Sequence, residues 1–230
     1  MRRRWIAPAY VGWVVCAGAS ASAATILDSS HPSTTVDGVI FTLAGPQAQP
    51  GLQFLGLQDK TRDGIEAGFN TASGSPMETK SGGKNLLVSD LKPLSIDSGS
   101  YFEFMLNTNE PNGGGKGSIS LDQLRIFVSD QPADLNSADK VYDLDATGDH
   151  AIVFNDHNNG QGVDLVVDIP AQLIQSGGGK FLTLYSSLGA TAPASGGPET
   201  WSALTRAIPE PSLVCLASMF AAGVLTRRRK

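Results

Sequence analysis

The feature of this sequence that most constrains its fold is an alternation of apolar and polar residues with a period of two. In the stretch VDLVVDI, the apolar side chains at positions 163, 165, 167 and 169 fall on one face of an extended chain. Asp164 and Asp168 fall on the opposite face. This period is that of a β-strand with one buried and one solvated face. We therefore expect a strand here, with its carboxylates directed mainly toward water.

Similar runs recur along the chain and are separated by clusters of Gly, Pro, Asn, Asp and Ser, which favour turns. The runs occupy 38–43, 51–57, 84–91, 101–109, 124–130, 140–145, 150–156 and 180–187, and a last one contains Trp201. The one helix that the sequence predicts inside the domain is a turn or two over 170–175, which begins at a proline. This pattern predicts an all-β fold, a single antiparallel β-sandwich or jelly-roll domain over 24–205.

The N-terminal segment has the organisation of a secretory signal peptide. Three arginines at 2–4 precede an apolar run over 6–18, and Ala21 and Ala23 form a small-x-small cleavage signal. An apolar run of that length is short for a spanning helix. We expect residues 1–23 to be removed after Ala23 and the domain to be exported.

The C-terminal segment, 206–230, combines a rigid tripeptide, an apolar run and a basic tail. Pro209, Glu210 and Pro211 precede the uncharged residues 212–226. The tail that follows consists of Arg227, Arg228, Arg229 and Lys230. A helix over 212–226 would be about 22 Å long, which is short against a hydrocarbon core of about 30 Å. The positive-inside rule keeps the four cations cytoplasmic, so the segment predicts a marginal or temporary inner-membrane anchor.

This order of features resembles the PEP-CTERM sorting signal, which is also labelled an ice-binding-protein C-terminal domain. The resemblance covers about 22 residues, from Pro209 to Lys230. The body, including LDQLRIFVSD and ETWSAL, is similar more weakly to other PEP-CTERM ectodomains, and it supplies no catalytic residues to transfer. The resemblance implies a Gram-negative bacterium that makes exopolysaccharide. It also implies an exosortase partner that recognises Pro209–Pro211, and a final location at the cell surface or in the extracellular matrix.

Charge and cysteine content exclude two classes of function. Seven of the 17 cations lie at the two ends, which leaves ten beside all 22 carboxylates between Asp28 and Glu210. Such an acidic body repels phosphates, so a nucleic-acid partner is not expected. The two cysteines, Cys16 and Cys215, both lie in the terminal apolar runs, so the domain has neither a disulfide nor thiol chemistry.

No catalytic motif is present, and we expect no enzymatic activity. The chain lacks G-x-S-x-G and H-E-x-x-H, and it has three histidines. Because triads and paired carboxylates are recognised by geometry, the sequence leaves a hydrolase open as an alternative.

The sequence requires no cofactor, because Asp, Asn and Gly in these loops form ordinary turns, and calcium is the alternative that the acidic loops leave open. In DLDATGDH, Asp143 and Asp145 stand at positions one and three of an EF-hand-like loop, with Asp149 nearby. Position twelve is Phe154 instead of Glu, so the loop departs from that pattern. A similar turn begins at Asp59, and a third loop contains Asp156 and Asp164.

Three functions follow from these observations. The first is a non-enzymatic surface or matrix protein associated with exopolysaccharide. The second is a carbohydrate-binding or carbohydrate-active β-sandwich, for which ring stacking would use Tyr101, Tyr142, Tyr185 or Trp201 unless these rings lie in the core. The third is a calcium-dependent interaction domain.

Overall fold

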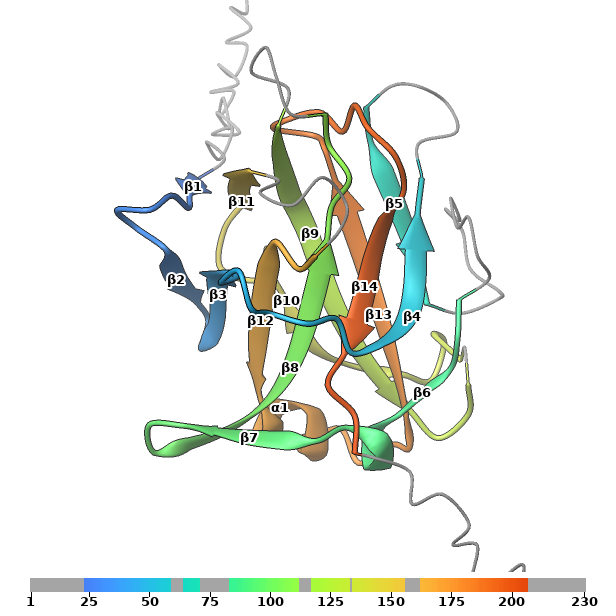
Figure 1. Cartoon of the computed structure of the whole chain (residues 1–230). Helices are drawn as coiled ribbons and strands as arrows, with labels where there is room; N and C mark the ends of the chain where they lie inside the picture. The colour runs from blue at the N-terminus through green and yellow to red at the C-terminus, as the bar shows by residue number, and fades with distance from the viewer. Residues whose placement is uncertain are drawn as a thin grey trace, which may run out of the picture.

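The computed structural model describes residues 23–58, 64–70, 83–111, 117–132, 134–155 and 162–206 (Figure 1). Its strands form two sheets of seven. The first sheet contains β1 (Ala23–Ile26), β5 (Glu66–Phe69), β6 (Leu86–Leu87), β9 (Ser118–Ser129), β10 (Asp139–Asp143), β11 (His150–Asn155) and β13 (Phe181–Leu188). The second contains β2 (Ser33–Val36), β3 (Val39–Leu43), β4 (Leu52–Leu57), β7 (Pro93–Ile96), β8 (Gly99–Asn107), β12 (Leu165–Pro170) and β14 (Glu199–Ala203). The described body is therefore mostly β, as the alternating pattern predicts.

Each sheet is organised around long central strands. In the first sheet the order is β1-β11-β9-β13-β5, and β10 pairs with β9 while β6 pairs with β13. In the second sheet the order is β2-β3-β12-β8-β14-β4, and β7 pairs with β8. All the pairings between these strands are antiparallel except that of β1 with β11.

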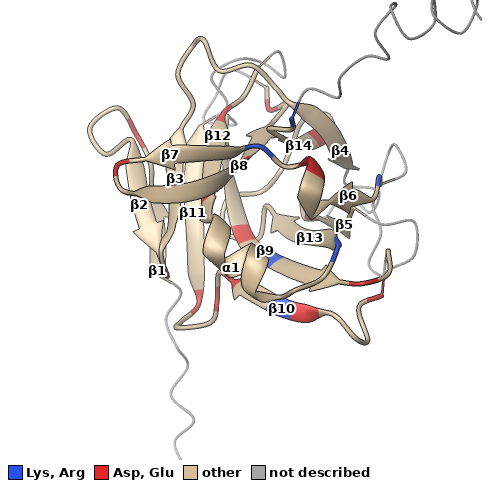
Figure 2. Ribbon diagram, turned by 90° about the horizontal axis from the view of Figure 1, so that it is seen from below, with Lys and Arg blue, Asp and Glu red and all other residues tan. Residues whose placement is uncertain are grey.

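The inward faces of the two sheets share one hydrophobic core. Its largest buried side chain is Trp201 of β14, which is wholly covered. The indole Nε1 of Trp201 donates a hydrogen bond of 2.9 Å to Ser186 Oγ on β13, which joins the two sheets through their interior. Helix α1 (Ala171–Ser176) contacts β8, β10 and β12 and buries Ala171 and Ile174. It therefore closes one end of the core, as the view from below shows (Figure 2).

The connection between β3 and β4 crosses the outer face of the second sheet (Figure 1). Near its end, the backbone N–H of Gly51 donates to Ser202 Oγ on β14. Met105, on the outward side of β8, is 3 % exposed and lies against this segment. The outer face of this sheet is thus partly covered by the chain itself.

Several sequence-based expectations need correction. Asp164 and Asp168 are both buried, so the second face of 163–169 is not solvated. The run 84–91 is a two-residue strand followed by a 3-10 turn, Val88–Asp90. The predicted strands did not include β1, β2, β5 and β7, each of which is only four residues long. The helix predicted over 170–175 is confirmed as α1.

Most residues of the predicted signal peptide and of the predicted C-terminal sorting segment lie outside the described residues. This holds for Ala21, for Pro209, Glu210 and Pro211, and for the run 212–226 with its tail, Arg227, Arg228, Arg229 and Lys230. Within the described ranges, no helix has the length and apolar character needed to cross a membrane.

Candidate functional site

A groove of about 290 Å³ opens beside β10 and α1. Its lining is contributed by Asp37 in the β2–β3 turn, four residues of β10, two of the β10–β11 loop and one of α1. These residues are Asp37, Lys140, Val141, Tyr142, Asp143, Ala146, Thr147 and Leu173. Apolar side chains and charged side chains therefore meet at one place, next to the loop for which the sequence leaves calcium open as an alternative.

Tyr142 lies between this groove and the core. Its ring is 5 % exposed, and its hydroxyl donates a long hydrogen bond of 3.4 Å to the carbonyl oxygen of Val36. Burial raises the pKa of the Tyr142 hydroxyl, and the negative charges of Asp37, Asp143 and Asp145 raise it further. The phenol therefore stays neutral at physiological pH.

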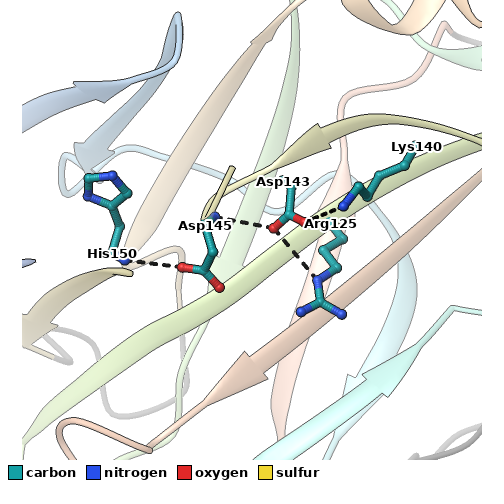
Figure 3. A network of polar contacts seen from close by, with 5 residues as sticks. All are labelled: Arg125, Lys140, Asp143, Asp145 and His150. Atoms are coloured by element: carbon teal, nitrogen blue, oxygen red, sulfur yellow. Dashed lines mark hydrogen bonds and ion pairs between the residues drawn. The ribbon is translucent and has the colours of Figure 1, made fainter. Parts of the chain in front are cut away.

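Asp143 is held by two cations, one from its own strand β10 and one from the neighbouring strand β9 (Figure 3). Lys140 Nζ lies 2.6 Å from its Oδ2, and Arg125 Nε of β9 lies 3.6 Å from its Oδ1. Burial acts to raise the pKa of Asp143. The hydrogen bonds from Lys140 and from the backbone N–H of Asp145, together with the charge of Arg125, outweigh burial and lower that pKa. Asp143 is therefore an ionised carboxylate whose charge is already balanced.

Asp145 has the opposite electrostatic environment. Burial raises the pKa of Asp145, and the charges of Asp143 and Asp149 add to that effect, although the N–H of His150 opposes it. That N–H donates to Asp145 Oδ1 at 3.1 Å (Figure 3). Beside it, the Thr147 hydroxyl donates to Asp37 Oδ2 at 3.0 Å. The loop is thus held by a hydrogen bond within itself and by another to the β2–β3 turn.

This geometry places two of the predicted calcium ligands side by side, but both have other partners. Asp143 balances Lys140 and Arg125, Asp145 accepts the His150 N–H, and Asp149 is exposed. Phe154, at the twelfth position, is buried in the core. Among the described residues, no group of three or more His, Cys, Asp or Glu side chains converges as a metal site. A calcium ion at this loop would compete with the two cations, and calcium binding there stays a prediction.

The other two loops contain residues with structural roles. Asn70 stands at the twelfth position of the turn that begins at Asp59. It is wholly buried, and its amide donates to the carbonyl oxygens of Lys84 and Leu182 and accepts from the N–H of Leu184. Asp164 accepts from both the N–H and the hydroxyl of Thr108. Asp59 and Asp156 lie outside the described residues.

The aromatic residues predicted for sugar stacking are mostly internal. Trp201 and Tyr142 are buried, Tyr185 is 8 % exposed, and Tyr101 is partly exposed. A different aromatic surface is formed by residues from separate strands, so the order of residues along the chain does not reveal it.

That surface, which we call the aromatic face, is the outer side of the first sheet. Phe69 of β5 and Tyr185 of β13 are register partners, with ring centroids 4.7 Å apart. Arg125 of β9 lies over the other side of the pair, 5.5 Å from the Tyr185 centroid. Phe127 and Phe181 share the same outward parity and are partly exposed. On β13, the polar residue Thr183 lies between Phe181 and Tyr185 and is the register partner of Phe127.

Comparison with known proteins does not add a functional assignment. No protein-family model matches the chain, and neither a curated protein nor a solved structure shows significant similarity to it.

Proposed function

We propose that this chain is an exported, non-enzymatic surface or matrix protein that is sorted through its C-terminal tripeptide. The observation that carries the proposal is the order of features in one chain. A signal-type segment precedes a β-rich body, and Pro209–Pro211, an apolar run and four cations follow it. Each feature alone is common, but together and in this order they resemble the PEP-CTERM sorting signal.

The described body fits between these two terminal segments. The N–H of Ala23 donates to the carbonyl oxygen of Asp149, and the N–H of Arg206 donates to that of Asp90. The hydrogen-bonded body therefore begins at Ala23, the last residue of the predicted signal peptide, and ends at the start of the predicted sorting segment. In this proposal, residues 1–23 are a signal peptide, the body is jelly-roll-like, and 212–226 is a short helix that holds it at the inner membrane until processing.

The test is processing in a bacterium that encodes an exosortase. Replacing Pro209, Glu210 and Pro211 by alanine is expected to leave a longer chain in the inner-membrane fraction, whereas the unaltered chain is shortened and released. Pro198→Ala is the matched control, because Pro198 also precedes a glutamate but lies in the folded body. Equal processing of the motif variant and the unaltered chain would count against the proposal.

A second candidate function is carbohydrate binding, and the aromatic face favours it. Phe69, Phe127 and Phe181 are partly exposed on a sheet surface that also carries Arg125 and Gln123. Aromatic rings interleaved with hydrogen-bonding groups match the apolar faces and hydroxyl edges of a sugar. Any such binding would associate the body with exopolysaccharide.

A glycan array with the full chain tests this second function. Phe127→Ala is expected to weaken any glycan signal about fivefold or more, since stacking on an aromatic ring contributes on the order of 1 kcal/mol. Leu52→Ala removes a more exposed apolar side chain from the other sheet and serves as the control. Absence of binding to every glycan, or equal loss in both variants, would exclude the aromatic face as a sugar site.

A further inference from the structure

One cation of the aromatic face, Arg125, has more hydrogen-bonding capacity than its neighbours use. Its side chain comes from the outer side of β9 and is 37 % exposed. The Nε atom lies 3.6 Å from Asp143 Oδ1, which is within ion-pair range but too long for a hydrogen bond. That nitrogen is buried and has no hydrogen-bond partner among the described residues. The guanidinium is therefore balanced in charge on one side, and its hydrogen-bond donors are not all used.

The other edge of the guanidinium is directed away from this ion pair. In Figure 3 the Nε side of Arg125 faces Asp143, and the two terminal nitrogens point away from that carboxylate. The guanidinium carbon lies 5.5 Å from the centroid of the Tyr185 ring, and this contact helps to orient the group. The paired N–H groups of a guanidinium form a planar fork that matches a carboxylate in a bidentate arrangement. The exposed fork of Arg125 therefore fits a carboxylate from outside the chain.

Aromatic rings lie beside this fork on two strands. Tyr185 of β13 is the register partner of Arg125, and Phe127 lies two residues further along β9 on the same face, about 7 Å away. A sugar ring that packs against Phe127 would thus have its substituents near Arg125. Lys140 of β10 is the register partner of Phe127 and adds a second cation. Both cations share one carboxylate, that of Asp143.

We propose that Arg125 makes the aromatic face selective for polysaccharides that contain uronic acids. This inference rests on the second candidate function, carbohydrate binding at that face, and it names the class of sugar. The guanidinium would bind the carboxylate of a uronate through two parallel N–H···O hydrogen bonds, while the ring of Phe127 packs against the sugar ring. Asp143 competes with the ligand for the same cations, so its charge limits the affinity.

The net charge of the body does not contribute to this recognition. Ten cations lie beside 22 carboxylates between Asp28 and Glu210, so the body as a whole repels an acidic polymer. At physiological ionic strength, charges more than about 8 Å apart are largely screened from each other. Selectivity therefore depends on contacts at Arg125, and binding is measured at that ionic strength.

Titration calorimetry of the full chain with oligogalacturonates and with their methyl esters tests this selectivity. The two ligands have the same sugar rings and differ in the charge of the carboxyl group. With a chelator present, we expect the acid to bind about fivefold more tightly than the ester. Arg125→Gln is expected to bring the two affinities together, whereas Phe127→Ala weakens both. Asp143→Asn is expected to strengthen binding of the acid, because it removes the competing carboxylate.

Circular dichroism checks that each variant folds. If Arg125→Gln does not fold, Arg125→Lys is the second variant, and it should reduce the preference for the acid because lysine lacks the planar fork. Equal affinities of the unaltered chain for acid and ester, or a preference that Arg125→Gln retains in full, would overturn this inference. In that case, binding of both ligands that Phe127→Ala weakens would still support the carbohydrate site. Failure of both ligands to bind also overturns the inference, and absence of binding to every glycan on the array removes the carbohydrate function with it.

Discussion

Asp168 provides a direct test of the electrostatics of the second sheet. It lies on the outward side of β12 opposite Glu103 of β8, is 6 % exposed, and its Oδ1 has no hydrogen-bond partner among the described residues. Burial raises the pKa of Asp168 from 3.8 to about 6, and the charge of Glu103 contributes to that shift. Burial also raises the pKa of Glu103, which the charge of Lys92 opposes. Replacement of Asp168 by Asn should therefore stabilise the protein at neutral pH.

The magnitude follows from linkage between proton binding and folding. A rise of about two pKa units corresponds to a cost of about 3 kcal/mol at pH 7, at 1.36 kcal/mol per unit. Because burial raises the folded-state pKa of Asp168, this cost is nearly absent below the unfolded pKa of 3.8, where the carboxyl is protonated in both states. The folded protein loses stability as the pH rises from 3.8 toward 6. The cost is about 0.5 kcal/mol at pH 4 by the same relation. We expect Asp168→Asn to gain about 1–3 kcal/mol at pH 7, since the amide still lacks a partner for its oxygen.

Urea unfolding at pH 7 and pH 4 measures this difference. Asp164→Asn is the matched control, because Asp164 lies in the same segment but accepts two hydrogen bonds from Thr108. It should lose about 1–3 kcal/mol at pH 7. If Asp168→Asn is less stable than the unaltered chain at pH 7, or if its advantage is equally large at pH 4, the reasoning about this buried carboxyl is wrong.

Three further substitutions test separate parts of the structure. Gly38→Ala should cost about 1 kcal/mol in urea unfolding, because Gly38 has φ +82 in the two-residue β2–β3 turn and alanine is strained there. Asn70→Ala should lower the unfolding free energy by about 2–4 kcal/mol, since it removes three buried hydrogen bonds to β13 and the segment before β6, whereas a loss under 1 kcal/mol would refute that structural role. Lys140→Ala should cost less than about 1 kcal/mol in the same assay, because the Lys140 side chain is half exposed and Arg125 still balances Asp143.

The strand pattern predicted the β-rich fold because one face of most strands packs against a shared core. Phe102, Phe104 and Leu106 of β8 alternate with more polar residues, and the structure buries all three. The four-residue strands were missed because such short runs contain too few alternations to distinguish them from turns. The parallel pairing of β1 with β11 depends on tertiary contacts that no local pattern encodes.

The burial of acidic residues could not be predicted from periodicity. Asp164 and Asp168 alternate with apolar residues as a solvated strand face would, yet both are covered by tertiary contacts. The aromatic face was also missed, since Phe69, Phe127 and Phe181 come from three different strands. Their common outward direction becomes evident only from the register of β5, β13 and β9.

The central claim is that the folded body is delivered by two removable end segments. Intact-mass spectrometry of the protein recovered from a bacterium with an exosortase tests it most directly. We expect a mature chain that begins at Ala24 and lacks the residues that follow the Pro209–Pro211 motif. Recovery of the complete chain, Met1 to Lys230, from the cytosolic fraction would contradict the account.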